Sequence, residues 1–434
     1  MSNGNGKPSP KKFLFVTNWA LATDLAYRIK QEGHKVRMYV ADKECKDIGD
    51  GVFDTVDNWK EHVEWADIVI FDDIGFGDDA DRLRKQGKPV VGGSVYTDRL
   101  EDDREFGQEE MKTVGISILP RWNFTNFDDA VKFIQKNPDR YVLKPSGKAQ
   151  NDKTLLFVGQ EDDGRDLIQI LEHYKKTWAK TIKEFIIQKY ASGVEVAVGA
   201  FFNGQEFTYP INVNFEHKRL FAGEIGPPTG EMGTSMFWSP PNAVFKETLG
   251  KMETRLRDAA YVGYVDINCI CNAKGIYPLE FTCRFGYPTI NIQMEGILSE
   301  LGEFFYALAS KQKPELRTKK GFQVGVVVAV PPFPYEDVKV FQRYSEGAVI
   351  LFKKELAEGF HPAELKMVEG DWVIAGVSGY ALIVTGSGST MHDARTAAYN
   401  RVKNIMIPNM FYRTDIGARW NEDSDRLQTW GYMY

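Results

Sequence analysis

The sequence of 434 residues predicts a multidomain protein that combines α/β and α+β architecture. Short apolar runs alternate with amphipathic helical segments over the first part of the chain, a pattern typical of a parallel sheet covered by helices. Further along, apolar runs follow one another in pairs across short polar turns, as the strands of antiparallel hairpins do. At about 150 residues per domain the length allows two to four domains, and 43% hydrophobic residues are enough to bury several cores.

The composition indicates which partners and which cellular compartment to expect. The net charge of −6 and the lack of long Lys/Arg runs argue against a surface that coats nucleic acid or binds a membrane electrostatically. No apolar run reaches about 18 residues, and the polar first residues lack the hydrophobic core of a signal peptide. We therefore expect a cytoplasmic globular protein, monomeric or homodimeric, with a disordered tail over residues 1–11. The cysteines predict reduced, buried thiols rather than a disulfide or a metal cluster: Cys45, Cys269, Cys271 and Cys283.

The first predicted domain, residues 12–104, opens with a strand, a helix and a second strand and adds two more strands around another helix. This order favours an open parallel sheet of the Rossmann-like kind. The turn after the first strand, residues 17–20, contains no glycine, so the phosphate-binding fingerprint of dinucleotide-binding sheets is absent. The expected strands cover residues 13–17, 34–40, 66–71 and 89–92, and the expected helices cover residues 20–31 and 78–86.

A smaller α+β module is expected within residues 105–190, which open in a charged helical stretch at residues 97–114. Its informative part is the loop of residues 145–153, where one glycine, two lysines and small polar residues lie between two strands. Such a loop suits a mobile cover over phosphate groups, and an ordinary solvated loop is the alternative. The expected strands cover residues 141–144, 154–158 and 185–189, and the expected helices cover residues 127–136 and 164–177.

The third predicted domain, residues 191–320, contains a long segment that is rich in turn residues. Within residues 214–235, four glycines and two prolines fall between Gly223 and Gly233. We expect no regular element there, and a long irregular segment inside a compact domain usually serves a site. The strands expected before this segment cover residues 195–202 and 206–211, and the helices expected after it cover residues 246–261 and 294–308.

Between those two helices the sequence predicts a β-hairpin with polar groups on otherwise apolar strands. Residues 264–271 and 276–283 flank a connection of four residues that includes a glycine. The alternation of side chains places the polar groups of each strand on one face: Asp266 and Asn268 on the first, and Glu280, Thr282 and Arg284 on the second.

Two carboxylates on neighbouring strands repel each other unless a cation lies between them. Mg²⁺ fits Asp266 and Glu280, because it takes oxygen ligands and is usually held by one or two carboxylates plus substrate phosphates. Arg284 would face an anion, since a guanidinium group matches a phosphate or a carboxylate with two hydrogen bonds. The alternative is a half-exposed hairpin with solvated charges.

Residues 321–434 are expected to form a closing strand-rich domain. Its apolar stretches cover residues 321–352 and 371–385, and a helix is expected at residues 391–405.

Six segments, in order along the chain, resemble the glycinamide ribonucleotide synthetases, the phosphoribosylamine–glycine ligase family of purine synthesis with the ATP-grasp fold. They are LEDDREFGQEEMKTVGI (100–116), LKPSG (143–147), QKYASGVE (188–195), EHKRL with GPPTGEMG (216–233), LEFTCRFGYP (279–288) and FYRTDIG (411–417). The resemblance implies a ligase that uses ATP and Mg²⁺ to join a small-molecule acid, glycine in the family, to an amine through an acyl phosphate.

The resemblance also implies roles for individual residues. ATP would be bound by Arg104, Lys144, Gly147, Gln188, Lys189, Tyr190 and Glu195. The substrates would be bound by Glu216, Thr229, Gly230 and Gly233. Catalytic roles would fall to Arg284, Lys218 and Glu231, and metal ligation to Asp266, Glu280 and Thr282.

Several departures from the family pattern concern the amine-binding half. The glycine-rich phosphate loop of the family is replaced by residues 18–21, and its Gly-Pro-Glu motif by residues 72–75. Pro228 stands where an asparagine is usual, Glu231 replaces a glycine, and Thr282 replaces an asparagine, which leaves a weaker metal ligand. A carboxylate at position 231 would attract a cationic amine and disfavour a phosphorylated one. The side chain of Trp19 would fill the space of a sugar phosphate.

Two classes of function remain open. The first is a ligase, either the purine enzyme itself or a relative that acts on another amine. The second is a nucleotide-binding regulator without turnover. A dinucleotide-dependent oxidoreductase is disfavoured by the missing glycine fingerprint.

Overall fold

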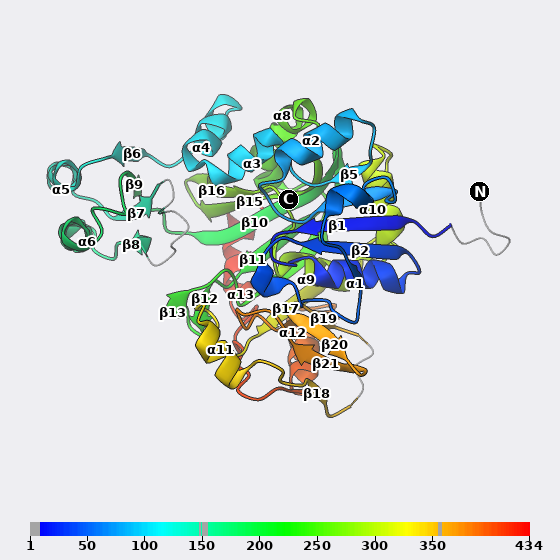
Figure 1. Ribbon diagram of the computed structural model, residues 1–434. Coiled ribbons are helices and arrows are strands. Elements are labelled where there is room, and N and C mark those ends of the chain that lie inside the picture. Colours follow the sequence, from blue (N-terminus) through cyan, green and yellow to red (C-terminus); the bar gives the residue numbers. More distant parts are fainter. Residues whose placement is uncertain (1–8, 147–148, 150–154, 355–357) are drawn as a thin grey trace.

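The computed structural model describes residues 9–146, 149, 155–354 and 358–434. At its N-terminal end lies the open parallel sheet that the sequence predicts, with the unpredicted short strand β3 added (Figure 1). Its strand order is β3-β2-β1-β4-β5. This order makes β1 and β4 neighbours, with the remaining strands added outward on either side. The elements are β1 (Lys12–Thr17), α1 (Thr23–Gln31), β2 (Lys35–Val40), β3 (Asp54–Thr55), β4 (Ile68–Phe71), α2 (Gly77–Lys85) and β5 (Val90–Val91).

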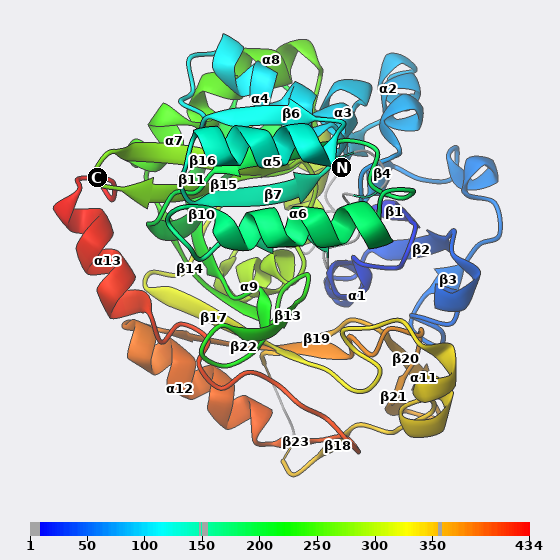
Figure 2. The ribbon, with the colours of Figure 1, turned by 90° about the vertical axis from the view of Figure 1, so that its left-hand side faces the viewer.

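The predicted charged helix at residues 97–114 is two helices that meet at Asp103, whose side chain caps the second. Beyond them a four-stranded sheet, β6-β9-β7-β8, projects from the rest of the molecule with its own hydrophobic core (Figure 1). Two helices cover its outward face (Figure 2). The elements are α3 (Val95–Asp102), α4 (Arg104–Thr113), β6 (Arg121–Phe124), α5 (Phe127–Lys136), β7 (Tyr141–Pro145), β8 (Phe157–Val158), α6 (Arg165–Thr177) and β9 (Phe185–Lys189).

An eight-stranded sheet forms the centre, with the order β16-β15-β10-β11-β14-β17-β22-β19. Its last three strands come from the C-terminal part of the chain, so the predicted closing region extends this sheet instead of building a separate one. The strands are β10 (Val194–Asn203), β11 (Phe207–Glu216), β14 (Gly233–Ser239), β15 (Val262–Asn272), β16 (Gly275–Thr282), β17 (Phe322–Val328), β19 (Phe360–Pro362) and β22 (Leu382–Gly388).

Three sequence predictions about this region were wrong. Residues 214–235 are not irregular, because they contain the hairpin β12 (Arg219–Phe221) and β13 (Ile225–Pro228) and the start of β14. The predicted helix at 246–261 is broken into α7 (Ala243–Glu247), a 3₁₀ turn (Leu249–Met252) and α8 (Glu253–Asp258). The predicted helix at 294–308 is two helices, α9 (Thr289–Gly296) and α10 (Leu301–Ala309), because Ile297 adopts an extended conformation.

The C-terminal elements complete the molecule around β17 and β22. Helix α12 packs against both strands, and α13 returns to the core beneath β10 and β15, where Leu427 is fully buried (Figure 2). The elements are α11 (Val338–Tyr344), β18 (Leu351–Phe352), β20 (Leu365–Val368), β21 (Asp371–Ile374), α12 (Met391–Val402), β23 (Ile405–Met406) and α13 (Trp420–Thr429).

The register of the central sheet gives it one polar and one apolar face, because directly paired residues share a face. One row of pairs runs from β16 to β22 through Glu280, Asn268, Ala197, Asn214, Met236, Gln323 and Ser387. The adjacent row on the opposite face passes through Ile267, Val198 and Val213, all of which belong to a hydrophobic core. The polar face is therefore built into the strands, and helix α9 packs across its β14, β17 and β22 end.

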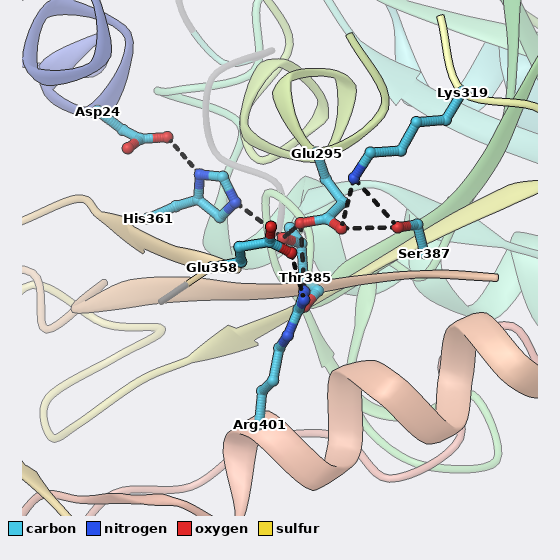
Figure 3. Close-up of polar contacts among 8 residues, drawn as sticks. All are labelled: Asp24, Glu295, Lys319, Glu358, His361, Thr385, Ser387 and Arg401. Carbon is cyan, nitrogen blue, oxygen red and sulfur yellow. Dashed lines mark hydrogen bonds and ion pairs between the residues drawn. The ribbon is translucent and has the colours of Figure 1, made fainter. Parts of the chain in front are cut away.

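A buried polar network joins this face to the N-terminal and C-terminal parts of the chain (Figure 3). Nδ1 of His361 lies 2.7 Å from Asp24 of α1, and its Nε2 lies 2.8 Å from the Thr385 hydroxyl. Thr385 donates in turn to Glu295 of α9 at 2.9 Å. The Glu295 carboxylate also accepts from Ser387 and pairs with Lys319 and Arg401. Since the acid is buried and fully partnered, the network holds three separate parts of the chain in one arrangement.

Replacing Glu295 by alanine should destabilise the fold by about 3–5 kcal/mol, because it leaves Arg401 and Lys319 without their buried partner. Urea unfolding measures this loss. Glu358→Gln is the matched control, since Glu358 pairs with the same arginine but its side chain is 71% exposed, and it should cost no more than about 1 kcal/mol.

The difference in stability between wild type and Glu295→Ala should depend on pH. Burial opposes ionisation of Glu295, but the Ser387 hydrogen bond and the charges of Arg401 and Lys319 lower its pKa below the ordinary 4.5. Its contribution is therefore present above pH 4.5 and is lost as the pH falls through the native pKa. The difference between wild type and Glu295→Ala should shrink below pH 4.5, and an unchanged difference would contradict the ion-pair explanation.

Candidate active site

One ammonium group lies among three carboxylates at the β16 end of the polar face. Nζ of Lys218 is 2.9 Å from Glu195, 3.1 Å from Glu216 and 3.9 Å from Glu280. Burial disfavours the charge of Lys218, but these carboxylates raise its pKa well above the ordinary value. The sequence predicts functional roles for all four residues, and the fold brings them together from β10, β11, β16 and the turn after β11. The cluster as a whole keeps an excess of negative charge.

Asp266 adds a further carboxylate behind this cluster. It is paired with Thr282 across β15 and β16, and Asn268 is paired with Glu280, so the predicted metal ligands share one face. Asp266 is 2% exposed, and its Oδ1 has no hydrogen-bond partner in the described part of the chain. Burial, and next the charge of Glu216, raise its pKa well above the ordinary value. A buried carboxylate in this position is stabilised by a cation.

The protein supplies only part of the ligand shell that a divalent cation needs. Across the described residues, no group of three or more His, Cys, Asp or Glu side chains could hold a metal ion by itself. Asp266, Glu280 and Thr282 offer two carboxylates and a hydroxyl on one face. This incomplete set of oxygen ligands fits Mg²⁺, which usually takes one or two carboxylates and completes its shell with phosphate oxygens and water.

Two half-buried cations face the cluster from the projecting module and its entry helix. Lys144 lies on β7, and Arg104 begins α4 and donates to the Pro145 carbonyl at 3.2 Å. Burial, and next the charge of Arg104, lower the pKa of Lys144 to about 8. Two neighbouring, partly desolvated cations repel each other, and an anion such as a polyphosphate would relieve both the repulsion and the loss of hydration.

The predicted adenine-binding residues lie at the end of β9. Gln188 is buried, but the side chain of Lys189 is at the surface and pairs with Asp139 at 2.6 Å. The backbone N–H groups of Lys189 and Tyr190 donate to the carbonyls of Pro120 and Arg140, so they are already used within the protein. That Lys189 and Tyr190 bind the nucleotide through backbone groups stays a prediction, with these two N–H groups already engaged within the protein. Gly147 lies outside the described residues.

The predicted substrate loop is hydrogen-bonded to the backbone of Lys218 through Thr229. Both the backbone N–H and the hydroxyl of Thr229 donate to the Lys218 carbonyl, at 2.7 and 2.8 Å. A Cβ on Gly233 would lie 2.5 Å from the Gly325 carbonyl, so a side chain cannot be accommodated there, whereas Gly230 faces open space. Glu231 is 6% exposed with an unpartnered Oε1 within the described chain, and burial, followed by the charge of Glu216, raises its pKa.

Two further side chains differ in their surroundings: Arg284 forms ion pairs within the protein, and His217 is buried. Arg284 pairs with Asp73 at 3.0 Å and Glu101 at 3.1 Å. Because β16 ends at Thr282, the prediction that Arg284 shares the strand face was wrong, and its expected contact with a substrate anion stays a prediction. His217 is buried, and burial and the charge of Arg419 lower its pKa to about 3, so it is a neutral packed imidazole.

Sequence reasoning missed several polar side chains on the same face. Asn214, Thr234 and Gln293 have buried polar atoms without partners in the described part of the chain. Natural proteins leave few such atoms unpaired, so a row of them next to the carboxylate cluster indicates space for ligands or water. The alternation Asn212, Asn214, Glu216 along β11 is the signal that could have revealed this face.

Comparisons with known proteins identify the family of the chain. Residues 102–290 match the family described as phosphoribosylglycinamide synthetase, ATP-grasp (A) domain, and residues 323–419 match its C domain. A phosphoribosylamine–glycine ligase from Listeria monocytogenes is 27% identical over 353 residues, which cover 78% of this chain and 80% of the relative. The chain belongs to the phosphoribosylglycinamide synthetase family of ATP-grasp ligases.

Solved structures agree with the predicted fold. The phosphoribosylamine–glycine ligase of Thermotoga maritima has a TM-score of 0.69 at 21% identity and covers 93% of this chain and 100% of its own. A biotin carboxylase from Campylobacter jejuni, in complex with a β,γ-ATP ligand, has a TM-score of 0.61 at 12% identity and covers 98% of each chain. The predicted ATP-grasp fold is confirmed. No helix of the described chain is long and apolar enough to cross a membrane. The cysteines are free and buried, as predicted.

Binding of ADP should weaken about tenfold between pH 7 and pH 9, because the Lys144 ammonium, with its pKa of about 8, loses its proton over this range. Lys144→Arg should bind with little pH dependence, since a guanidinium group stays charged. Calorimetric titration at the two pH values tests both proteins, with the surface change Lys132→Arg as control. Equal pH dependence in Lys144→Arg and wild type would exclude Lys144 from the phosphate site.

Proposed function

We propose that this protein is an ATP-dependent carboxylate–amine ligase, with glycine as the favoured acid, that forms an amide through an acyl phosphate. One observation carries the proposal: two half-buried cations and a cluster of carboxylates with excess negative charge face each other across one site. The charges of Glu280, Lys218 and Glu195 all act on Lys144, so the two groups lie within electrostatic reach. Such an arrangement suits a substrate that brings both phosphates and a divalent cation. The assignment to a ligase family and the names of its relatives support it.

The chain's residues would position and neutralise the reacting groups. Lys144 and Arg104 would neutralise phosphates of ATP, and Glu195 would help to hold the nucleotide. Asp266 and Glu280, with Thr282, would hold Mg²⁺, which would offset the charge on the phosphates during transfer. Arg284 would act as a positioning residue, since it fixes Glu101 behind the backbone of Cys283.

The proposed reaction has two steps, phosphorylation of the acid and displacement of phosphate by the amine. An oxygen of the acid attacks the γ-phosphorus of ATP and ADP leaves, which yields an acyl phosphate. The amine nitrogen then attacks the carbonyl carbon, phosphate leaves, and the amine loses a proton. Lys218 would stabilise negative charge on the acyl phosphate, and Glu231, beside Lys218 and Glu216, would attract the amine. Most of the rate enhancement in such transfers comes from positioning and charge stabilisation.

With ATP, Mg²⁺ and glycine, the protein should release ADP when a suitable amine is added. A coupled assay for ADP with a panel of amines, and with other acids in place of glycine, measures this. ATP binding without ADP release for any combination would contradict a ligase and favour a nucleotide-binding regulator.

Glu280→Gln should slow turnover at least about a hundredfold, since metal clamps of this kind contribute several kcal/mol to the barrier. The matched control is Glu172→Gln, an exposed carboxylate on α6 that should leave the rate unchanged. An unaltered rate and unaltered Mg²⁺ dependence in Glu280→Gln would reject the metal site.

A further inference from the structure

The crevice at the carboxyl ends of β1 and β4 is the place where an open parallel sheet usually binds its ligand. The strand order reverses between these two neighbours, and ligands bind at such switch points. Thr17 ends β1, Asp72 directly follows β4, and helix α1 starts a few residues after Thr17. Phosphate groups bind at helix N-termini of this kind through free backbone N–H groups.

Here a side chain of the protein takes that position. Oδ2 of Asp72 accepts a hydrogen bond from the backbone N–H of Ala22, the residue that precedes α1, at 3.0 Å. Asp72 is 1% exposed, and the Tyr287 hydroxyl donates to its backbone carbonyl at 3.0 Å, which fixes it from the α9 side. Thr17 is fully buried as well, and its side-chain hydrogen bond to Asp72 lowers the pKa of that carboxylate against the effect of burial.

The loop between β1 and α1 does not offer a second phosphate cradle. Ala20 adopts a φ of 58° with its methyl group buried, at a position where glycine would be free of strain. Trp19 is 51% exposed, and that its indole fills the space of a sugar phosphate stays a prediction. The buried carboxylate of Asp72 is the group that occupies the helix N-terminus.

The charges around the crevice oppose a phosphate as well. Asp73 follows Asp72, and Asp24 lies in the first turn of α1, where it accepts from Asn291 at 2.9 Å and contacts His361. Arg284, whose charge acts on Asp72, is itself paired with Asp73 and Glu101. Burial and the charge of Asp73 already raise the pKa of Asp72 to about 7. A phosphate at the same place would add a further negative charge at close range.

We infer that Asp72 replaces a substrate phosphate at the N-terminus of α1, and that the amine joined by this protein carries no phosphate group. This inference rests on the proposed ligase function and names the class of its amine: a small amine, cationic when protonated, that suits an acidic crevice. The relatives are named for phosphoribosylamine, which carries a phosphate. Like-charge repulsion between Asp72 and that phosphate is the physical basis of the difference.

The test compares two amines that differ only in the phosphate: ribosylamine and phosphoribosylamine, each formed in place from ammonia and the sugar. With ATP, Mg²⁺ and glycine, wild type should favour the unphosphorylated amine in kcat/KM by at least about tenfold, since like charges at close range cost several kcal/mol. Asp72→Ala should shift the ratio toward the phosphorylated amine. Asp78→Asn, an exposed carboxylate on α2, is the control and should keep the wild-type ratio. A wild-type preference for phosphoribosylamine would overturn the inference.

A binding measurement separates this inference from the proposed function. Ribose 5-phosphate should not bind wild type in calorimetry, and it should bind Asp72→Ala. If no amine supports ADP release, the ligase proposal fails, and this titration still decides the role of Asp72. Equal binding of ribose 5-phosphate to both proteins would refute that role. If Asp72→Ala does not fold, the titration of wild type decides. Binding of ribose 5-phosphate to wild type then refutes the inference, and the absence of binding supports it.

Discussion

The interaction on which the site depends is the placement of one ammonium group, that of Lys218, among the carboxylates of Glu195, Glu216 and Glu280. Three acids at one position could not all stay ionised without a cation, and one ammonium group compensates only part of their charge. The remaining negative charge, with buried Asp266 behind it, gives the site an affinity for further cations. Lys144 and Arg104, on the opposite side, give it an affinity for anions.

The central sheet makes this arrangement possible. Its polar face runs from Glu280 on β16 to Ser387 on β22, and its other face packs into hydrophobic cores. A buried polar face of this length is stable only when the groups that cover it form hydrogen bonds or ion pairs with its side chains. Helix α9 does so at one end through Glu295, which is held by Thr385, Ser387 and two cations. Toward the other end Asn214 and Thr234 keep buried polar atoms without partners among the described residues, and there we propose that the substrates bind.

Local signals in the sequence predicted much of the fold but little of how its parts meet. Helix α5 and strand β9 lie where periodicity predicts them, and the hairpin β15–β16 places Asp266 and Glu280 on one face as alternation requires. The pairing of Lys218 with Glu195 and Glu280, and that of Arg284 with Asp73 and Glu101, could not be predicted, because these residues lie far apart in the chain. For the same reason the joining of β17, β22 and β19 to the central sheet was missed. The resemblance to a ligase family supplied roles that periodicity alone could not.

The central claim, that the carboxylates of one β-hairpin share a divalent cation with a nucleotide, has a direct test. Crystals grown with ADP and Mn²⁺ in place of Mg²⁺ allow the metal to be located from its anomalous scattering. We predict a peak within coordination distance of Asp266 or Glu280 and of a phosphate oxygen. A bound nucleotide whose metal ion contacts neither carboxylate would contradict the account.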